Sequence, residues 1–209
     1  MIYDCEINIE EWYKQKEIQR NKSNSTLLEL GFSTLFLNRT NRSGIIKGGV
    51  IGGKEQKGYY KLDCRFNKEK LINKINIIAS KKDQIELFNE DAIILIDKVI
   101  KNTRNSFTFF DPPYFEKGPS LYTNFYSEED HIDLAKKIKQ DLRERTWIVT
   151  YDHTHEIKSI YSNLEYIEYS LSYTAQEKTK GIEYMFFSKK TDSNCPENYL
   201  TVLKELTST

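Results

Sequence analysis

The chain has 209 residues, with 31 basic and 31 acidic side chains, so its formal net charge is zero. That balance argues against a protein that coats nucleic acid, although it permits a local basic patch. Apolar residues make up 38% and charged residues 30%, which excludes a disordered chain and predicts a globular core. There is no apolar run of membrane-spanning length, no secretory signal pattern and no paired cysteine spacing, so we expect a cytoplasmic protein without a membrane partner.

The first 80 residues are predicted to be helical. Residues 9–37 read as helix, and Asn67 can cap a further helix in which Leu71, Ile75 and Ile78 recur at helical spacing. We treat residues 1–80 as one region on this basis.

A glycine-rich basic segment, residues 38–61, interrupts these helices. Six of the nine glycines of the chain fall between Gly44 and Gly58, and Glu55 is the sole acidic residue among six basic ones. Glycine permits left-handed turns and close backbone approach, so the segment is predicted to be a turn-rich insert.

From residue 84 onward, strand and helix patterns alternate. The predicted strands cover residues 85–88, 106–110, 147–151, 164–170 and 182–187. The predicted helices cover residues 92–101, 127–145 and 155–161. Ser127 with Asp130 three residues later has the spacing of a capping box. This alternation predicts an α/β fold with a mostly parallel sheet, and residues 81–209 form the second region.

The tetrapeptide Asp111-Pro112-Pro113-Tyr114 follows an apolar strand, so it should lie at the carboxyl end, where open α/β sheets place their ligands. Two prolines remove two amide donors and leave carbonyl acceptors. A carboxylate beside a carbonyl can hold both hydrogens of an NH₂ group, and a tyrosine ring offers a stacking surface worth about 1–3 kcal/mol per base. By itself the tetrapeptide is equally compatible with a turn that ends a strand.

The tetrapeptide matches the catalytic motif of adenine-N6 DNA methyltransferases, and the wider chain resembles their D12 class, which includes the Dam-type enzymes. Supporting segments occur in the family's order between about residues 25 and 187. They are residues 36–44 (FLNRTNRSG), 88–92 (FNEDA), 150–153 (TYDH) and 178–183 (KTKGIE). The resemblance implies an S-adenosylmethionine-dependent, Rossmann-type methyltransferase sheet with a small helical and loop recognition insert.

The resemblance also implies roles for single residues. Asp111 and the Pro112 carbonyl would hold N6 of an adenine flipped out of double-stranded DNA, Pro113 completes the motif, and Tyr114 would stack on the base. Asp91 and Asp111 would line the S-adenosylmethionine site, with Asp91 near the adenosine part. The methyl group would pass directly to N6, without a metal. Whether Asp111 removes a proton or only polarises N6 stays open, and Asp91 can equally serve as a helix N-cap.

The resemblance implies that residues 1–80 form the target-recognition region and that residues 81–209 are the C-terminal part of the catalytic methyltransferase domain. Within the first region, the basic side chains of residues 38–61 would contact phosphates. The candidate DNA-binding residues are Asn38, Arg39, Arg42, Lys47, Lys54, Lys57 and Lys178. The alternative for this segment is a solvated loop.

Elsewhere, His153 and His155 have a spacing seen in metal sites, although a loop role is favoured because no third ligand is evident. Tyr122 and Tyr126 could help to hold the base or simply pack in the core.

The chain departs from the family at its start. The family begins with a lysine-containing segment and a glycine-rich cofactor loop, but the first 30 residues here contain no glycine. We therefore expect a sheet truncated at its N-terminal side, with an exposed edge that a companion chain or self-association would cover, or a damaged gene product.

Two functions follow from these patterns. The first is a site-specific DNA adenine N6-methyltransferase, of the kind found in restriction-modification systems. The alternative is a catalytically incomplete DNA-binding remnant or subunit that needs a companion chain to bind S-adenosylmethionine. Methylation of cytosine N4 or of a glutamine side chain is a weaker option, since the leading aspartate of the tetrapeptide and the insert favour adenine.

Overall fold

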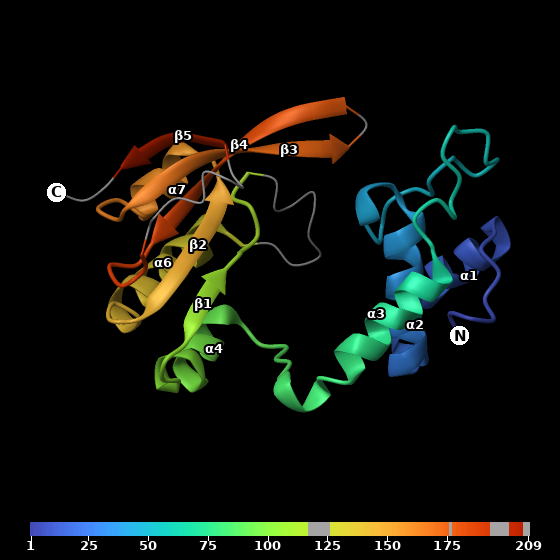
Figure 1. Ribbon diagram of the computed structural model, residues 1–209, viewed down its shortest axis with the longest axis horizontal. Helices are drawn as coiled ribbons and strands as arrows, with labels where there is room; N and C mark the ends of the chain where they lie inside the picture. Colours follow the sequence, from blue (N-terminus) through green and yellow to red (C-terminus); the bar gives the residue numbers. More distant parts are fainter. Residues whose placement is uncertain (117–125, 176, 193–200, 207–209) are drawn as a thin grey trace. The chain divides into compact units, whose positions relative to one another are not determined.

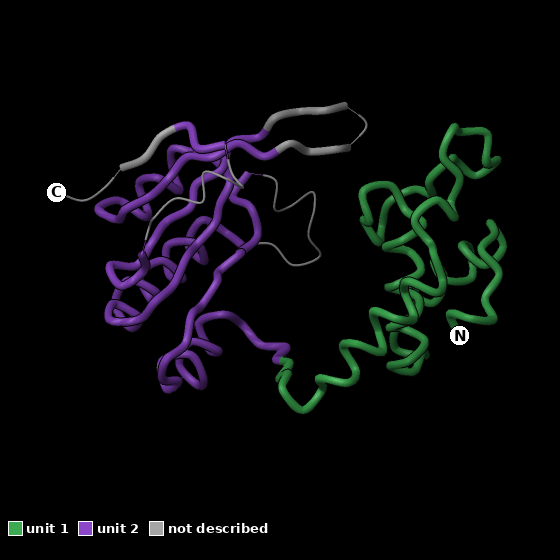
Figure 2. Tube along the Cα trace, in the orientation of Figure 1, with its two compact units in different colours: residues 1–87 green, residues 88–209 purple. Residues whose placement is uncertain are grey.

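The computed structural model describes the backbone of residues 1–116, 126–175, 177–192 and 201–206, and their side chains outside 172–180 and 204–206. The chain forms two compact units, Met1–Leu87 and Phe88–Thr209 (Figure 2). These units meet at residues 87 and 88, whereas the sequence regions divide at 80 and 81. The roles assigned to the two regions stay a prediction.

Unit 1 is helical. Its helices are α1 (Ile9–Arg20), α2 (Leu27–Thr40) and α3 (Lys68–Ala79), with short 3-10 turns η1 (Lys22–Asn24), η2 (Arg42–Gly44) and η3 (Lys82–Gln84). The helical character predicted for residues 9–37 is confirmed, and it is divided between α1 and α2 because Thr26 and Glu29 form a capping box that starts α2 anew. The predicted cap of α3 is confirmed, since Asn67 Oδ1 accepts from the Lys70 amide at 2.9 Å.

The core of unit 1 lies between α1 and α2. Trp12, Phe36 and Leu37 are buried there, and the Trp12 indole donates to the buried Asn41 side chain at 2.7 Å. On α3 only Leu71 is buried, whereas Ile75 and Ile78 are exposed.

Unit 2 contains a five-stranded sheet in the order β1-β2-β4-β3-β5 (Figure 1). The strands are β1 (Phe107–Phe110), β2 (Thr146–Asp152), β3 (Tyr166–Ala175), β4 (Glu177–Phe187) and β5 (Thr201–Leu206). The predicted α/β class is confirmed. The expectation of a mostly parallel sheet is wrong for the described strands, because only β1 and β2 pair in parallel. The reason is connectivity: α6 joins β1 to β2, while β3 and β4 form a hairpin, which must be antiparallel.

Two other strand predictions are wrong. Residues 85–88 form no strand, and all four are exposed. The sequence pattern also predicts residues 182–187 to be the last strand, but β5 follows it.

Helices cover one face of the sheet (Figure 1). They are α4 (Ala92–Lys98), α6 (Glu128–Asp141) and α7 (His155–Ile160), and the 3-10 turn η4 (Ile100–Asn102) follows α4. The capping box of Ser127 and Asp130 is confirmed at the start of α6, although this helix ends at Asp141 rather than near 145. Ile96, Ile138 and Ile157 pack from these three helices onto the strands.

The opposite face of the sheet carries a smaller apolar cluster around Ile167, Tyr169 and Phe187. Because strand side chains alternate between faces, residues 148, 150 and 152 of β2 point to this second face. Thr150, Asp152 and Glu183 of the candidate site lie on it.

Candidate active site

The tetrapeptide lies where the sequence predicts, at the carboxyl end of β1. Phe110, the last residue of the strand, is buried in the core, and it pairs in parallel with Val149 of β2. Because the two strands run in the same direction, both carboxyl ends lie at one edge of the sheet.

Asp111 is exposed and is held by its neighbouring strand. The hydroxyl of Thr150, buried on β2, donates to Asp111 Oδ1 at 3.1 Å. Pro112 is buried and Pro113 is half-buried, so the backbone between Asp111 and Tyr114 is packed against the protein. The Asp111 carboxylate is thus exposed to solvent while the backbone that carries it is held in place.

Tyr114 is anchored through its hydroxyl. It donates to Glu183 Oε1 on β4 at 2.5 Å, and Tyr169 of β3 donates to Glu183 Oε2 at 2.6 Å. Glu183 is 4% exposed, so a buried carboxylate bridges the tetrapeptide and the sheet.

Asp152 holds the two residues that follow the tetrapeptide. Its Oδ1 accepts from the Phe115 amide at 2.8 Å, and its Oδ2 accepts from the Glu116 amide at 3.0 Å. These are the first backbone donors after Tyr114, and both bind one carboxylate.

A cavity of about 570 Å³ opens beside the tetrapeptide, within the range of small-molecule sites. Its lining residues are Asn89, Glu90, Asp91, Ala92, Leu95, Phe109, Phe110, Asp111, Pro112, Pro113, Tyr126 and Leu134. Asp91 and Asp111, 20 positions apart in sequence, therefore line one cavity. Asp91 is also the N-cap of α4, because its Oδ1 accepts from the Ile93 amide at 2.8 Å.

Tyr126 belongs to the wall of this cavity. Its pKa is raised, mainly because burial disfavours the phenolate and also because the carboxylates of Asp91 and Asp130 repel it. The hydroxyl therefore stays protonated at neutral pH and can donate a hydrogen bond. Tyr122 lies outside the described residues.

A buried histidine of α6 contacts residues close to the tetrapeptide. His131 of α6 pairs through Nδ1 with the Tyr151 hydroxyl at 2.8 Å, and its ring packs against Phe115 and Tyr126 at 5.2 and 5.3 Å. Burial lowers the pKa of His131 and raises the pKa of Tyr151, so both are neutral at physiological pH.

A family model, D12 class N6 adenine-specific DNA methyltransferase, matches residues 4–177. The chain belongs to this family. No curated protein matches it. Membership supports a methyltransferase that acts on adenine in DNA. Among the helices of the described residues, none combines the length and apolar character that a membrane crossing requires.

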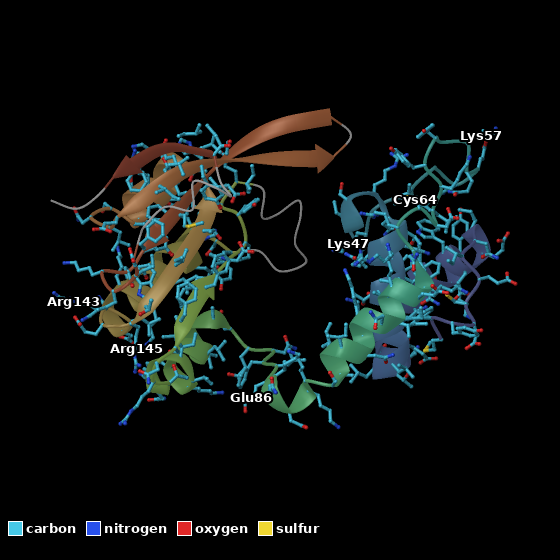
Figure 3. All side chains as sticks on the ribbon, viewed as in Figure 1. Lys47, Lys57, Cys64, Glu86, Arg143 and Arg145 are labelled. Carbon is cyan, nitrogen blue, oxygen red and sulfur yellow. The ribbon has the colours of Figure 1, made fainter. Side chains whose placement is uncertain are left out.

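The basic segment of this methyltransferase family member lies in unit 1. Arg42, Lys47, Lys54 and Lys57 are exposed, and Figure 3 shows Lys47 and Lys57 at the surface. Lys57 pairs with Glu55 at 2.5 Å, while Lys54 lies 5.9 Å from the ring centre of Tyr13.

Asn38 and Arg39 are placed differently from these cations. Asn38 donates to the Gly44 carbonyl at 3.2 Å, and Gly44 has φ +74°, with its missing Cβ position only 2.8 Å from Asn38 Nδ2. Arg39 is half-buried, and its Nε is buried without a hydrogen-bond partner among the described residues. Lys178 lies in β4, and its side chain is outside the described part.

Two cations that sequence reasoning missed hold this segment in shape. Lys16 of α1 donates to the carbonyls of residues 46, 47 and 48 at 3.3, 3.1 and 3.2 Å. Arg65 donates to the carbonyls of Asn38, at 3.2 Å, and Asn41. No sequence signal separates these two from solvated lysines and arginines.

The two histidines with metal-like spacing take other roles. His153 stacks on Tyr184 with ring centres 4.3 Å apart, and His155 begins α7. Across the described residues, no group of three or more His, Cys, Asp or Glu is arranged to hold a metal ion.

Proposed function

We propose that this chain is a site-specific DNA adenine N6-methyltransferase that uses S-adenosylmethionine and acts on an adenine flipped out of double-stranded DNA. One observation carries the proposal: Asp111, fixed by Thr150, stands at the rim of a cavity that Asp91 also lines. A restriction-modification setting suits such an activity, and the target sequence is left open.

The tetrapeptide can grip an exocyclic amine. Asp111 supplies a carboxylate acceptor, and Pro112 and Pro113 supply carbonyls without competing amide donors. Such a grip draws the nitrogen lone pair out of conjugation and toward an electrophile. The ring of Tyr114, held by its hydroxyl, gives the base a stacking surface, which offsets the few kcal/mol that extrusion costs.

The cavity fits the cofactor in volume and in chemistry. S-adenosylmethionine, when bound, supplies an electrophilic methyl group on a sulfonium. Asp91 and the protonated Tyr126 offer an acceptor and a donor for its polar groups, and Leu95 and Phe110 offer an apolar wall. We propose that Asp91 holds the adenosine part while Asp111 faces the methyl group.

DNA binding is proposed for unit 1 and residues 38–61. Four exposed cations lie on a segment that Lys16 and Arg65 hold in shape, namely Arg42, Lys47, Lys54 and Lys57. They can therefore contact phosphates without the entropy cost of ordering a flexible loop. Asn38, which is exposed, and Arg39, which is half-buried, are proposed to contact DNA as well. Lys178 would contact phosphate from the β3–β4 hairpin.

A segment from outside these residues is proposed to complete the cofactor site. The sheet ends at β1, whose outer edge pairs with no described strand and bears Phe107 and Phe109 at 56% and 54% exposure. A companion chain, a second copy or another part of the same polypeptide could supply the glycine-rich loop of the family and cover this edge.

The test is calorimetric titration with S-adenosylmethionine, followed by transfer of a labelled methyl group to unmethylated genomic DNA. Asp111→Ala should abolish transfer while sparing DNA affinity, and Asp133→Ala, an exposed acid on α6, is the matched control. Wild-type transfer by Asp111→Ala would overturn the site. DNA binding without any cofactor binding would instead identify a DNA-binding subunit that needs its companion.

A further inference from the structure

We propose that Asp152 and Glu183 are positioning residues that together hold Tyr114, Phe115 and Glu116, and thereby set the geometry of the catalytic tetrapeptide. This inference rests on the proposed function for its effect on catalysis. It names two residues to which the tetrapeptide motif itself assigns no role.

The sheet brings the two carboxylates side by side. Asp152 is the last residue of β2, and it is the direct register partner of Glu183 on antiparallel β4. Directly opposed residues of an antiparallel pair point to the same face, so both carboxylates lie on the face that α4, α6 and α7 leave open. Thr150, which holds Asp111, points to that face as well.

The pair compensates for a weakness of the tetrapeptide. Pro112 and Pro113 have no amide hydrogen, so the backbone at the reacting position cannot be tied down through its own donors. Three donors close to the prolines are the Tyr114 hydroxyl and the amides of Phe115 and Glu116. All three donate to Asp152 or Glu183, over 2.5 to 3.0 Å.

Burial makes the hydrogen bond between Tyr114 and Glu183 a strong constraint. Glu183 is 4% exposed, and a buried carboxylate is costly unless hydrogen bonds compensate for its lost hydration. Two tyrosine hydroxyls, from Tyr114 and Tyr169, donate to its two oxygens. Hydrogen bonds to an ionised acceptor are about twice as strong as neutral ones, so moving the Tyr114 ring would carry a large penalty.

The expected consequence is a ring and a carbonyl held in place before DNA binds. Removing part of the constraint should slow transfer more than it weakens binding, because a misplacement of about 1 Å can cost about 100-fold in rate. A role in folding alone would lower the amount of active protein and leave kcat per active molecule unchanged.

Asp152→Asn and Glu183→Gln test this inference, with Asp133→Asn and Glu144→Gln as matched controls on exposed acids. In Asp152→Asn, one amide must face an NH₂ group instead of an oxygen. We expect hydrogen exchange across residues 114–116 to accelerate at least about tenfold, as expected when an amide loses a bond worth roughly 1.5 kcal/mol or more. Unchanged exchange there would overturn the role of Asp152.

A double-mutant cycle tests Glu183. Tyr114→Phe keeps the stacking ring and removes only the hydroxyl. If Glu183 acts through that hydroxyl, Tyr114→Phe and Glu183→Gln should each lower kcat with KM for DNA near wild type, and the double variant should lose no more than the worse single variant. Additive losses, or losses confined to KM, would overturn the proposal.

The exchange measurement needs neither cofactor nor DNA. If the wild-type chain transfers no methyl group, the proposed function fails, while accelerated exchange in Asp152→Asn would still support its part of the constraint. Normal transfer with wild-type kcat in both carboxylate variants would instead reject the positioning role and leave the methyltransferase assignment intact.

Discussion

The buried hydroxyl of Thr150 and the exposed carboxylate of Asp111 are joined by a hydrogen bond of 3.1 Å across the parallel strands β1 and β2. The bond ties the proposed amine-gripping group to β2, the second strand of the sheet. Its donor, Thr150, lies 39 residues further along the chain.

Thr150→Val should therefore lower methyl transfer while preserving the fold. The substitution keeps the shape and removes a hydrogen bond to a charged group, worth about 1.5–3 kcal/mol, so we expect a decrease in kcat of roughly tenfold or more. Steady-state kinetics with labelled cofactor would measure it. Thr146→Val, at the start of the same strand, is the control, and equal kinetics in the two variants would contradict the prediction.

Two substitutions at Asp91 should separate its role as the N-cap of α4 from its proposed role in cofactor binding. Asparagine caps helices as well as aspartate, so Asp91→Asn should retain the stability of α4, whereas Asp91→Ala should lose about 1 kcal/mol of unfolding free energy. If Asp91 also binds the cofactor through its charge, both variants should bind S-adenosylmethionine more weakly. Calorimetry decides this, and wild-type affinity in Asp91→Asn would leave the residue as a cap alone.

Loss of exposed charge on residues 38–61 should change the salt dependence of DNA binding. Each phosphate contact contributes about 0.9 to the slope of log K against log salt. Arg42→Gln with Lys47→Gln should therefore reduce the slope by roughly 2 on any duplex. Fluorescence anisotropy between low and moderate salt measures the slope. Lys190→Gln, a surface change in unit 2, is the control, and an unaltered slope in the double variant would count against the recognition role.

Lys16 should matter more than its neighbour Lys14. Lys16→Met removes the donor for three carbonyls, and we expect unit 1 to lose about 1–2 kcal/mol of unfolding free energy along with some DNA affinity. Urea unfolding followed by Trp12 fluorescence, in a Trp147→Phe background, measures the change. Lys14→Met on the exposed side of α1 should unfold like the parent protein, and equal effects of the two variants would refute the anchoring role.

His131 should make unit 2 sensitive to mild acid. Burial lowers its pKa below the ordinary value of 6.5, so the unfolded chain binds a proton at a pH where the folded chain does not. The contribution to stability is complete above pH 6.5 and is lost as the pH falls below it. His131→Gln should therefore show a smaller difference in unfolding free energy between pH 7.5 and 5.5 than the wild type. Urea titrations at both pH values measure the difference, and the exposed His155→Gln should match the wild type.

Local signals predicted much of this fold. The capping box at Ser127, the cap at Asn67 and the strand before the tetrapeptide depend on short stretches of sequence, and all three are confirmed. The pattern of residues 85–88 resembles a strand just as well, but a strand forms only where a neighbouring strand supplies hydrogen bonds, and none of the described strands does so there.

The site was predictable only in part. The tetrapeptide can be predicted as part of the site from its own residues and from the apolar strand that precedes it. Asp152 and Glu183 occur in segments that resemble the family, yet their roles depend on the register of β2 against β4. Register between strands about 30 residues apart is set by tertiary packing, which a single sequence does not reveal.

The outer edge of β1 also affects how the protein behaves in the test tube. Among the described strands none pairs with this edge, and an apolar strand with an unpaired row of amides and carbonyls is a template on which other extended chains can assemble. The exposed Phe107 and Phe109 make this edge strand apolar, so concentrated samples should form sheet-like aggregates. A lysine in place of Phe107 should keep such samples clear and leave the hydrogen bonds between β1 and β2 in place.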